Sequence, residues 1–344
     1  MKNMKKQLID LLNIHATSGN EKPVRDYLII EMSKLVNKMQ VDNYGNLLAE
    51  KTCGNGKGAT VLLSAHMDTV RGVQANKKLV EKNGKISAVL PNGASGVLGA
   101  DDRAGIAIIL TVLRNISATN FNGTIKVAFS REEEIGCVGA DKIDPKWYED
   151  ADLAIVVDRR GNRDIVVGCG GAFCCDEVGN FMEEVAKMAD MPDWKAKEGG
   201  VSDAMTFSSN GVNSINLSAG YYNEHTDKEY VVLSQMKDTT RLILQSIAVI
   251  NDIAHTFCEV PHENQWVQAW YPKSTKGGYS NQAIYNAYGV EIEEDIYAEE
   301  YDKNGDVYVY EMGMNTVAIT QGNNEILMSK ESLKSIFEQI KHLL

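Results

Sequence analysis

Short apolar runs alternate with segments of helical spacing through most of the chain. Continuous apolar runs predict strands that are covered on both faces, and apolar positions that recur every three or four residues predict helices. The predicted strands span 60–65, 124–129, 153–157, 165–167 and 214–217, with extended chain over 40–50. The predicted helices span 4–12, 21–39, 102–114, 176–190, 203–209 and 233–257. This alternation predicts an α/β fold, a three-layer sandwich with a mixed, largely parallel central sheet flanked by helices.

The pattern changes near residue 258. Residues 264–312 are rich in Tyr, Trp, Asn and Glu, with strands expected over 307–310 and 316–320 and a helix over 329–343. We therefore predict two parts, a core over 1–258 and a small C-terminal α+β appendage of unknown role over 259–344. Within the appendage, Trp266 and Trp270 are expected to pack, and 302–306 to form a hairpin turn rather than a calcium loop.

Composition narrows the class of protein. Among 344 residues, 47 are acidic and 35 are Lys or Arg, and the net charge of −12 argues against a nucleic-acid partner, which needs a basic surface. No apolar stretch approaches the length of about 18 residues that a membrane helix requires, so no membrane partner is expected. Six scattered cysteines without a CxxC pair indicate reduced thiols and a cytoplasmic location.

Acidic and imidazole side chains follow the predicted strands. Residues two apart in an extended backbone share one face, so the first pair can lie side by side. Taken singly, such residues are ordinary loop groups or helix caps. Four of the five segments come just after a strand, and the other begins a helix: His66 and Asp68, Asp101 and Asp102, Glu132–Glu134, Asp158, and His225.

These positions gather on one rim of a parallel sheet, because the carboxyl ends of parallel strands meet there. Carboxylates packed that densely repel one another unless a cation compensates them. Imidazole and carboxylate ligands together suit zinc, and cobalt or manganese is also tolerated. The sequence therefore predicts a divalent metal centre.

The same segments resemble the zinc-dependent exopeptidases with co-catalytic metals over roughly residues 5–257. Ser64–Val70, Leu98–Ala107 and Glu132–Gly136 resemble motifs of tripeptidase T. Gly199–Ala204 and the loop Tyr221–His225 are more similar to glutamyl aminopeptidases. Five segments in the same order make the resemblance specific.

The resemblance implies roles for individual residues. His66, Asp101 and Asp158 would hold one of two divalent ions. Asp101, Glu134 and His225 would hold the other, so that Asp101 bridges. Glu133 would be the general base, and Asp68 would orient His66 by accepting its far N–H. The resemblance also implies a cis peptide bond between Asp101 and Asp102.

The reaction expected from the resemblance is hydrolysis of peptide bonds by an aminopeptidase acting on small peptides. A deacylase or carboxypeptidase of the same superfamily stays an alternative, because Arg159 and Arg160 beside Asp158 could bind a carboxylate. A non-enzymatic relative is disfavoured, since it would be expected to lack ligands. The chain between Asp68 and Asp101 is long enough for a hairpin over 77–90 but not for the lid domain that the resembling enzymes insert. Such lids contact the substrate and often form the oligomer interface, so the oligomeric state and the preferred substrate side chain stay open.

Two further residues lie near these motifs. Asp203 could bind a substrate amino group or cap the helix that follows it, and we favour the cap. Cys137 is predicted to be a packed thiol.

Overall fold

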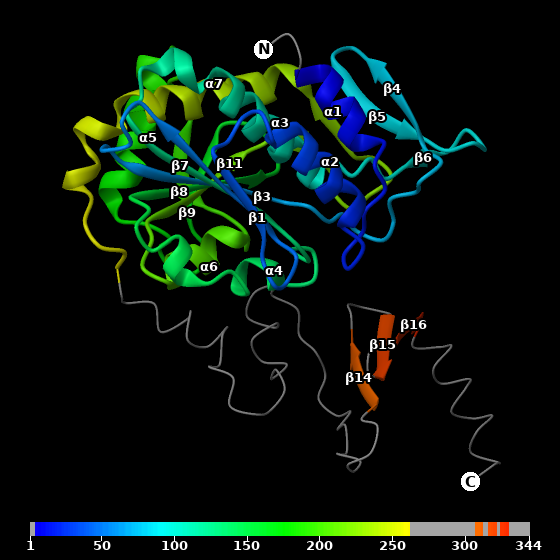
Figure 1. The fold of residues 1–344 in the computed structure, drawn as a ribbon. Coiled ribbons are helices and arrows are strands. Elements are labelled where there is room, and N and C mark those ends of the chain that lie inside the picture. Colours follow the sequence, from blue (N-terminus) through cyan, green and yellow to red (C-terminus); the bar gives the residue numbers. More distant parts are fainter. Residues whose placement is uncertain (1–3, 262–306, 312–315, 322–323, 330–344) are drawn as a thin grey trace, which may run out of the picture. The chain divides into compact units, whose positions relative to one another are not determined.

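The computed structural model describes residues 4–261, 307–311, 316–321 and 324–329 (Figure 1). Contacts divide the chain into two units, 1–275 and 276–344. The first unit contains the central sheet and all the helices that the structure describes. The boundary expected at 258–259 stays a prediction.

The first unit is built on an eight-stranded mixed sheet, which confirms the predicted α/β class. The four strands at its centre are parallel, and the pairs at the β1–β2–β7 edge are antiparallel. In spatial order the strands are β1 (Lys38–Val41), β2 (Leu47–Cys53), β7 (Gly123–Ser130), β3 (Thr60–His66), β8 (Leu153–Arg159), β11 (Ser214–Ser218), β9 (Asp164–Gly168) and β10 (Lys195–Glu198).

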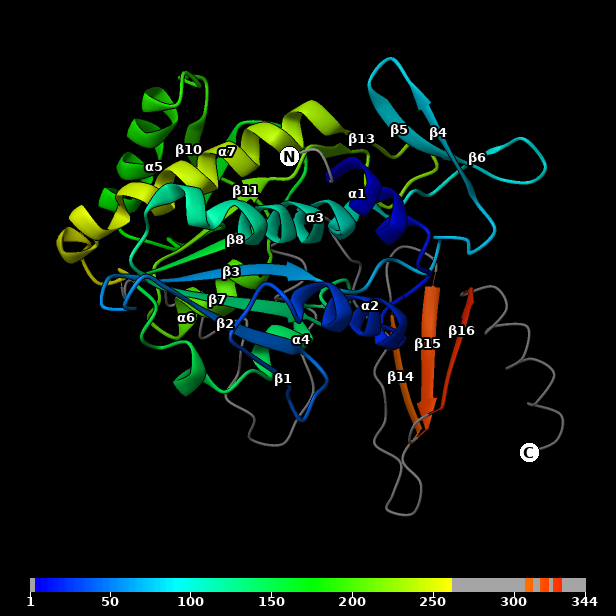
Figure 2. The same ribbon diagram turned by 45° about the horizontal axis from the view of Figure 1, so that its top comes forward.

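Helices cover both faces of this sheet (Figure 2). They are α1 (Met4–Leu12), α2 (Lys22–Met32), α3 (Ala100–Asn115), α4 (Val138–Asp141), α5 (Asp176–Met188), α6 (Asp203–Ser209) and α7 (Leu233–Val249). Successive residues of a strand point to opposite faces. Accordingly, Leu63 of β3 packs in the cluster that includes α1, α3, α5 and α7, whereas Leu62 packs in the cluster that includes α4 and α6.

Helix α3 is buried along nearly its whole length, from Ala100 to Leu113. It lies on β3 and β8 and also contacts α1 and α7. After the charged residues of its first turn the helix is almost wholly apolar, so it must be covered on every side, and this arrangement covers it. Its N-terminus consequently sits near the carboxyl ends of the strands on which it packs.

A second, smaller sheet joins two distant segments. Its strands are β4 (Lys78–Lys82), β5 (Lys85–Val89), β6 (Ser95–Gly96), β12 (Tyr221–Tyr222) and β13 (Tyr230–Val232). The hairpin expected over 77–90 forms β4 and β5. The pairing of β5 with β13 was not predicted, and it ties this hairpin to the segment that carries His225.

Two helices end earlier than predicted. The helix expected over 21–39 stops at Met32, because the chain then turns and β1 pairs with β2. The helix expected over 233–257 stops at Val249 and continues as short 3₁₀ turns. In the first of these turns, the Asn251 side chain accepts from the Ala59 amide and donates to the Asn122 carbonyl, which fixes the chain outside the helix.

The described part of the second unit is a three-stranded antiparallel sheet, β14 (Val307–Glu311), β15 (Thr316–Gln321) and β16 (Asn324–Ser329). The first two strands confirm the expected strands. Ser329 ends β16 rather than beginning a helix, and the remainder of the helix expected over 329–343 lies outside the described residues. Trp266, Trp270 and the turn expected over 302–306 also lie outside them.

Candidate metal centre

The structure brings the predicted side chains together at one edge of the central sheet. His66 is the last residue of β3, and Asp158 is the penultimate residue of β8. Glu133 and Glu134 follow β7, Asp101 lies in the first turn of α3, and His225 lies between β12 and β13. Strands, a helix terminus and a hairpin therefore each deliver part of the cluster.

One group combines an imidazole and two carboxylates. His66 Nε2 lies 2.9 Å from Asp101 Oδ1 and 3.5 Å from Asp158 Oδ1. Potential ligand atoms of these three residues all lie within 4.8 Å of one another. All three side chains are at least nine-tenths buried.

A second group shares one member with the first. His225 Nε2 lies 2.8 Å from Glu134 Oε2 and 3.1 Å from Asp101 Oδ2. The two oxygens of Asp101 thus face different histidines. The Asp101–Asp102 peptide bond is cis, as the resemblance implied.

Asp68 links the first histidine to the loop after β7. His66 Nδ1 is 3.1 Å from the Asp68 carbonyl oxygen and 3.3 Å from its Oδ1, so the Nδ1–H can donate there and leave Nε2 free as a ligand atom. The Asp68 carboxylate also accepts from the backbone N–H groups of Glu133 and Glu134, at 3.0 and 3.2 Å, and from the Ser18 hydroxyl. Burial opposes ionisation of Asp68, but His66 and these donors lower its pKa overall.

The buried carboxylates repel one another, and burial together with this repulsion raises the pKa of several of them. Burial and the charge of Asp101 raise the pKa of Asp158 to about 7. Burial and the charge of Asp158 raise the pKa of Glu133 well above its usual range, and burial with Asp101 raises that of Glu134. The raised pKa values reflect a surplus of negative charge in the cluster, which a bound cation would neutralise in part.

The residues fit divalent cations. Glu134 Oε1 is buried without a hydrogen-bond partner, which is costly unless a ligand occupies that side. Each group offers imidazole nitrogen and carboxylate oxygen, the donor set that zinc, cobalt and manganese accept. Three ionised carboxylates would offset most of the charge of two divalent ions.

Glu133 lies beside the first group. Its Oε2 lies 3.9 Å from His66 Nε2, and its Oε1 accepts from the Cys137 thiol at 3.4 Å. The preceding residue, Glu132, faces elsewhere, because its carboxylate is bonded to Tyr44 and Arg131. Cys137 is buried as predicted, and burial together with the charge of Glu133 raises its pKa well above the usual value.

The favoured interpretation of Asp203 as a helix cap is wrong. Ser202 is the N-cap of α6, and its hydroxyl accepts from the Ala204 amide. Asp203 instead accepts from the Ser130 hydroxyl and lies beside Glu133 and Cys137. The sequence pattern placed the N-cap at Asp203, one residue after its actual position at Ser202.

Two functional neighbours were missed by sequence reasoning. The Tyr221 hydroxyl donates to Asp158 Oδ1 at 3.0 Å, and the Glu229 carboxylate accepts from backbone amides around Asp101. Their closeness to His225 in the chain was the available signal. Their partners, however, are known only once the hairpin is placed against α3 and β8.

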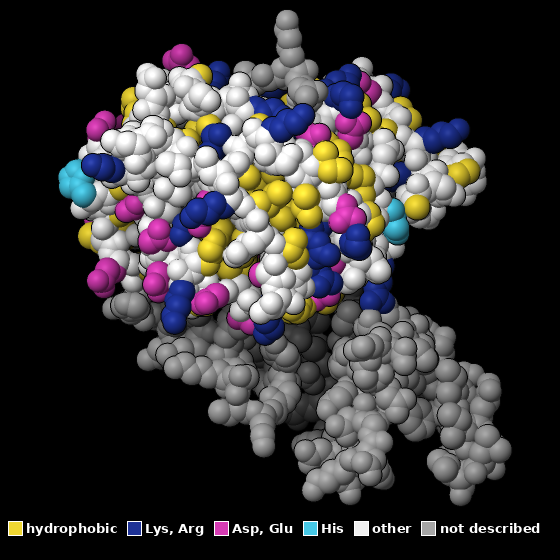
Figure 3. Space-filling view, viewed as in Figure 1, with side chains coloured by type: hydrophobic (Ala, Val, Ile, Leu, Met, Phe, Trp, Pro, Cys, Tyr) yellow, Lys and Arg dark blue, Asp and Glu magenta, His cyan; other side chains and the backbone are white. Residues whose placement is uncertain are grey.

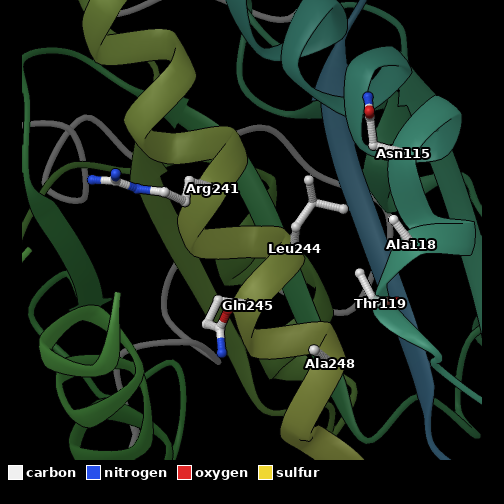
Figure 4. Close-up of a pocket in the computed structure, with 7 residues that line it drawn as sticks. All are labelled: Asn115, Ala118, Thr119, Arg241, Leu244, Gln245 and Ala248. Carbon is white, nitrogen blue, oxygen red and sulfur yellow. The ribbon is translucent and has the colours of Figure 1, made fainter. Parts of the chain in front are cut away.

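One cavity lies beside the His225 loop, and another lies at the end of helix α3 that is far from the candidate residues. The first, of about 380 Å³, is lined by Arg160, Asn223, Glu224, Thr226, Asp227 and Lys228. The second, of about 370 Å³, lies between the end of α3 and helix α7 and contains none of the candidate residues (Figure 4). On the face in Figure 3, basic and acidic side chains are interspersed. Among the described helices, none is long and apolar enough to cross a membrane.

Comparison with known proteins finds similarity to aminopeptidases and other peptidases. Residues 88–242 match the family of M42 glutamyl aminopeptidases. A candidate aminopeptidase of Acetivibrio thermocellus is 24% identical, with 70% of this chain and 98% of the relative covered. A peptidase T of Halothermothrix orenii is 31% identical over 175 residues, and that match spans 42% of each chain.

Solved structures share the fold. The aminopeptidase PepT of Bacillus cereus has a TM-score of 0.64 at 18% identity, covering 72% of this chain and 98% of its own. An aminopeptidase from the archaeon Desulfurococcus kamchatkensis has a TM-score of 0.59 at 18% identity, covering 71% and 95%.

The electrostatics predict how the metal-free protein responds to pH. Asp158 has a pKa of about 7, and hydrogen bonds to Asp101 and Glu134 raise that of His225 to about 11. In the unfolded chain these groups titrate near about 3.9 and 6.5. Folding therefore favours the protonated forms of both groups. For each group, the free energy of unfolding falls as the pH rises from its pKa in the unfolded chain to its pKa in the folded chain.

We expect the unfolding temperature of the protein in chelator to fall between about pH 6 and about pH 8.5. Saturating zinc should shrink or reverse this slope, because zinc replaces protons. Thermal unfolding followed by circular dichroism measures both, and a metal-free protein that gains stability over this pH range would contradict the prediction.

Proposed function

We propose that the chain is a co-catalytic zinc exopeptidase, and specifically an aminopeptidase that releases N-terminal residues from small peptides. The observation that carries the proposal is the shared carboxylate of Asp101, whose two oxygens face His66 and His225. Such an arrangement suits a pair of metal ions held close together. The family match and the similar peptidases support the choice of an aminopeptidase.

We assign the metal ligands from the two groups. His66, Asp101 and Asp158 would hold one ion, and Asp101, Glu134 and His225 the other. When bound, such ions supply Lewis acidity, which polarises a carbonyl and makes water a better nucleophile near neutral pH. Zinc is the proposed ion, with cobalt or manganese as alternatives, because the donors are imidazole and carboxylate.

Glu133 is the proposed general base. It would take a proton from the attacking water and return it to the leaving amine. The Glu133 side chain is only 13% exposed, and the N–H bonds to Asp68 fix the backbone at Glu133 and Glu134. Asp68 thereby aligns His66 and Glu133 together.

The deacylase or carboxypeptidase alternative is not favoured. It rested on Arg159 and Arg160 as carboxylate binders. Arg159 Nε lies 3.3 Å from Asp164, and Arg160 donates to Glu224 at 2.7 Å. Both guanidinium groups are thus already engaged by carboxylates.

We further propose that residues 1–258 form the catalytic part and that the protein works in the cytoplasm. All the candidate residues lie within that range. All six cysteines are unpaired, which suits a reducing compartment.

A substrate panel tests the class of reaction. With zinc, cobalt or manganese, we expect the tripeptide alanyl-leucyl-glycine to release alanine from its N-terminus, and its N-acetyl derivative to be left intact. Analysis of the free amino acids identifies the end that is cleaved, because N-terminal cleavage releases alanine and C-terminal cleavage releases glycine. Hydrolysis confined to the acetylated peptide, or release from the C-terminus, would contradict the assignment.

A matched pair of variants tests the general base. Glu133→Gln should lower kcat about 10²- to 10⁴-fold while the protein keeps its metal, because only proton transfer is lost. Glu132→Gln removes a neighbouring carboxylate that faces Tyr44 and Arg131, and it should stay within a few-fold of the parent. Steady-state kinetics with metal analysis measures both. Normal turnover by Glu133→Gln would overturn the role.

A further inference from the structure

The hairpin that carries His225 reaches both ligand groups. Strand β12 leads into the loop 223–229, and β13 returns from it to pair with β5. The Tyr221 carbonyl accepts from the Gly161 amide at 2.7 Å, which fastens the start of the hairpin to the end of β8. The hairpin is therefore anchored at both ends, on either side of its histidine.

At one end, Tyr221 contacts a ligand of the first group. Its hydroxyl donates to Asp158 Oδ1 at 3.0 Å, and its side chain is 2% exposed. A hydrogen bond to a carboxylate oxygen restricts the rotation of that carboxylate. The neighbouring Tyr222 points elsewhere, because its hydroxyl donates to Gln235 at 2.9 Å.

At the other end, Glu229 holds the backbone of the shared ligand. Its Oε2 accepts from the Gly99 amide at 2.7 Å, and its Oε1 accepts from the amides of Ala100 and Asp101 at 2.7 and 3.2 Å. The side chain is 1% exposed. These amides open helix α3 and have no partner within the helix, so a single buried carboxylate satisfies all three.

We propose that Tyr221 and Glu229 are positioning residues that hold Asp158 and Asp101, so that the hairpin carrying His225 couples both cation sites. The inference rests on the proposed function, since it takes these aspartates as metal ligands. One hairpin then provides a ligand to one site, orients a ligand of the other and fixes the ligand that both share. Neither residue needs to touch the substrate.

The two variants have different expected effects. Tyr221→Phe removes one hydroxyl and should weaken the site of His66, Asp101 and Asp158 about 10-fold. Glu229→Gln places an amide N–H₂ where an acceptor is needed, and because Asp101 is shared it should weaken both sites about 10- to 100-fold.

Titration of the chelator-treated, full-length protein with Co²⁺ tests this, followed by visible absorption. The matched controls are Tyr222→Phe and Asp227→Asn, the latter an exposed carboxylate in the same loop. The parent and both controls should bind two Co²⁺ ions per chain with the same affinities. Far-UV circular dichroism establishes that each variant is folded, and Tyr221→Phe keeps the test decisive if Glu229→Gln does not fold.

The outcomes separate this inference from the proposed function. If Tyr221→Phe titrates like Tyr222→Phe, or folded Glu229→Gln titrates like Asp227→Asn, the coupling by the hairpin is overturned while the metal centre stands. If the parent binds no Co²⁺, the proposed function and this inference both fail.

Discussion

The arrangement depends on one carboxylate, that of Asp101, which lies between two imidazole rings. His66 comes from the end of β3 and His225 from the β12–β13 hairpin, so these elements converge on the first turn of α3. Helix α3 can bring Asp101 there because it is buried against β3 and β8 along its length. The hydrophobic core thus determines where the charged centre forms.

Burying this many acidic groups in one place is unfavourable for the protein alone. The raised pKa values of Asp158, Glu133 and Glu134 share one cause, burial beside other carboxylates. Hydrogen bonds offset part of the cost, since Asp68 and Glu229 both accept from backbone amides. The unpartnered oxygen of Glu134 shows where protein donors alone do not suffice. Cations complete the balance of charge in the proposed function.

The sequence was informative where a periodic pattern leads directly to a position in space. Apolar runs located the central strands, and the rule that parallel strands end at one rim indicated that His66 and Asp158 would be neighbours. It was less informative where distant segments choose between partners. The β5–β13 pairing, the contact of Asp203 with Ser130 and the bonds of Glu229 to α3 depend on tertiary packing. Residues 21–39 have helical spacing throughout, but the helix ends at Met32, and the last residues of the segment pair with β2 as the start of β1.

In the proposed function Asp101 is the ligand that two metal ions share, and anomalous diffraction from zinc-soaked crystals tests this sharing. We expect two peaks at the zinc edge, one contacting His66, Asp101 and Asp158 and the other contacting Asp101, Glu134 and His225. A single peak, or two peaks of which one does not contact Asp101, would contradict it.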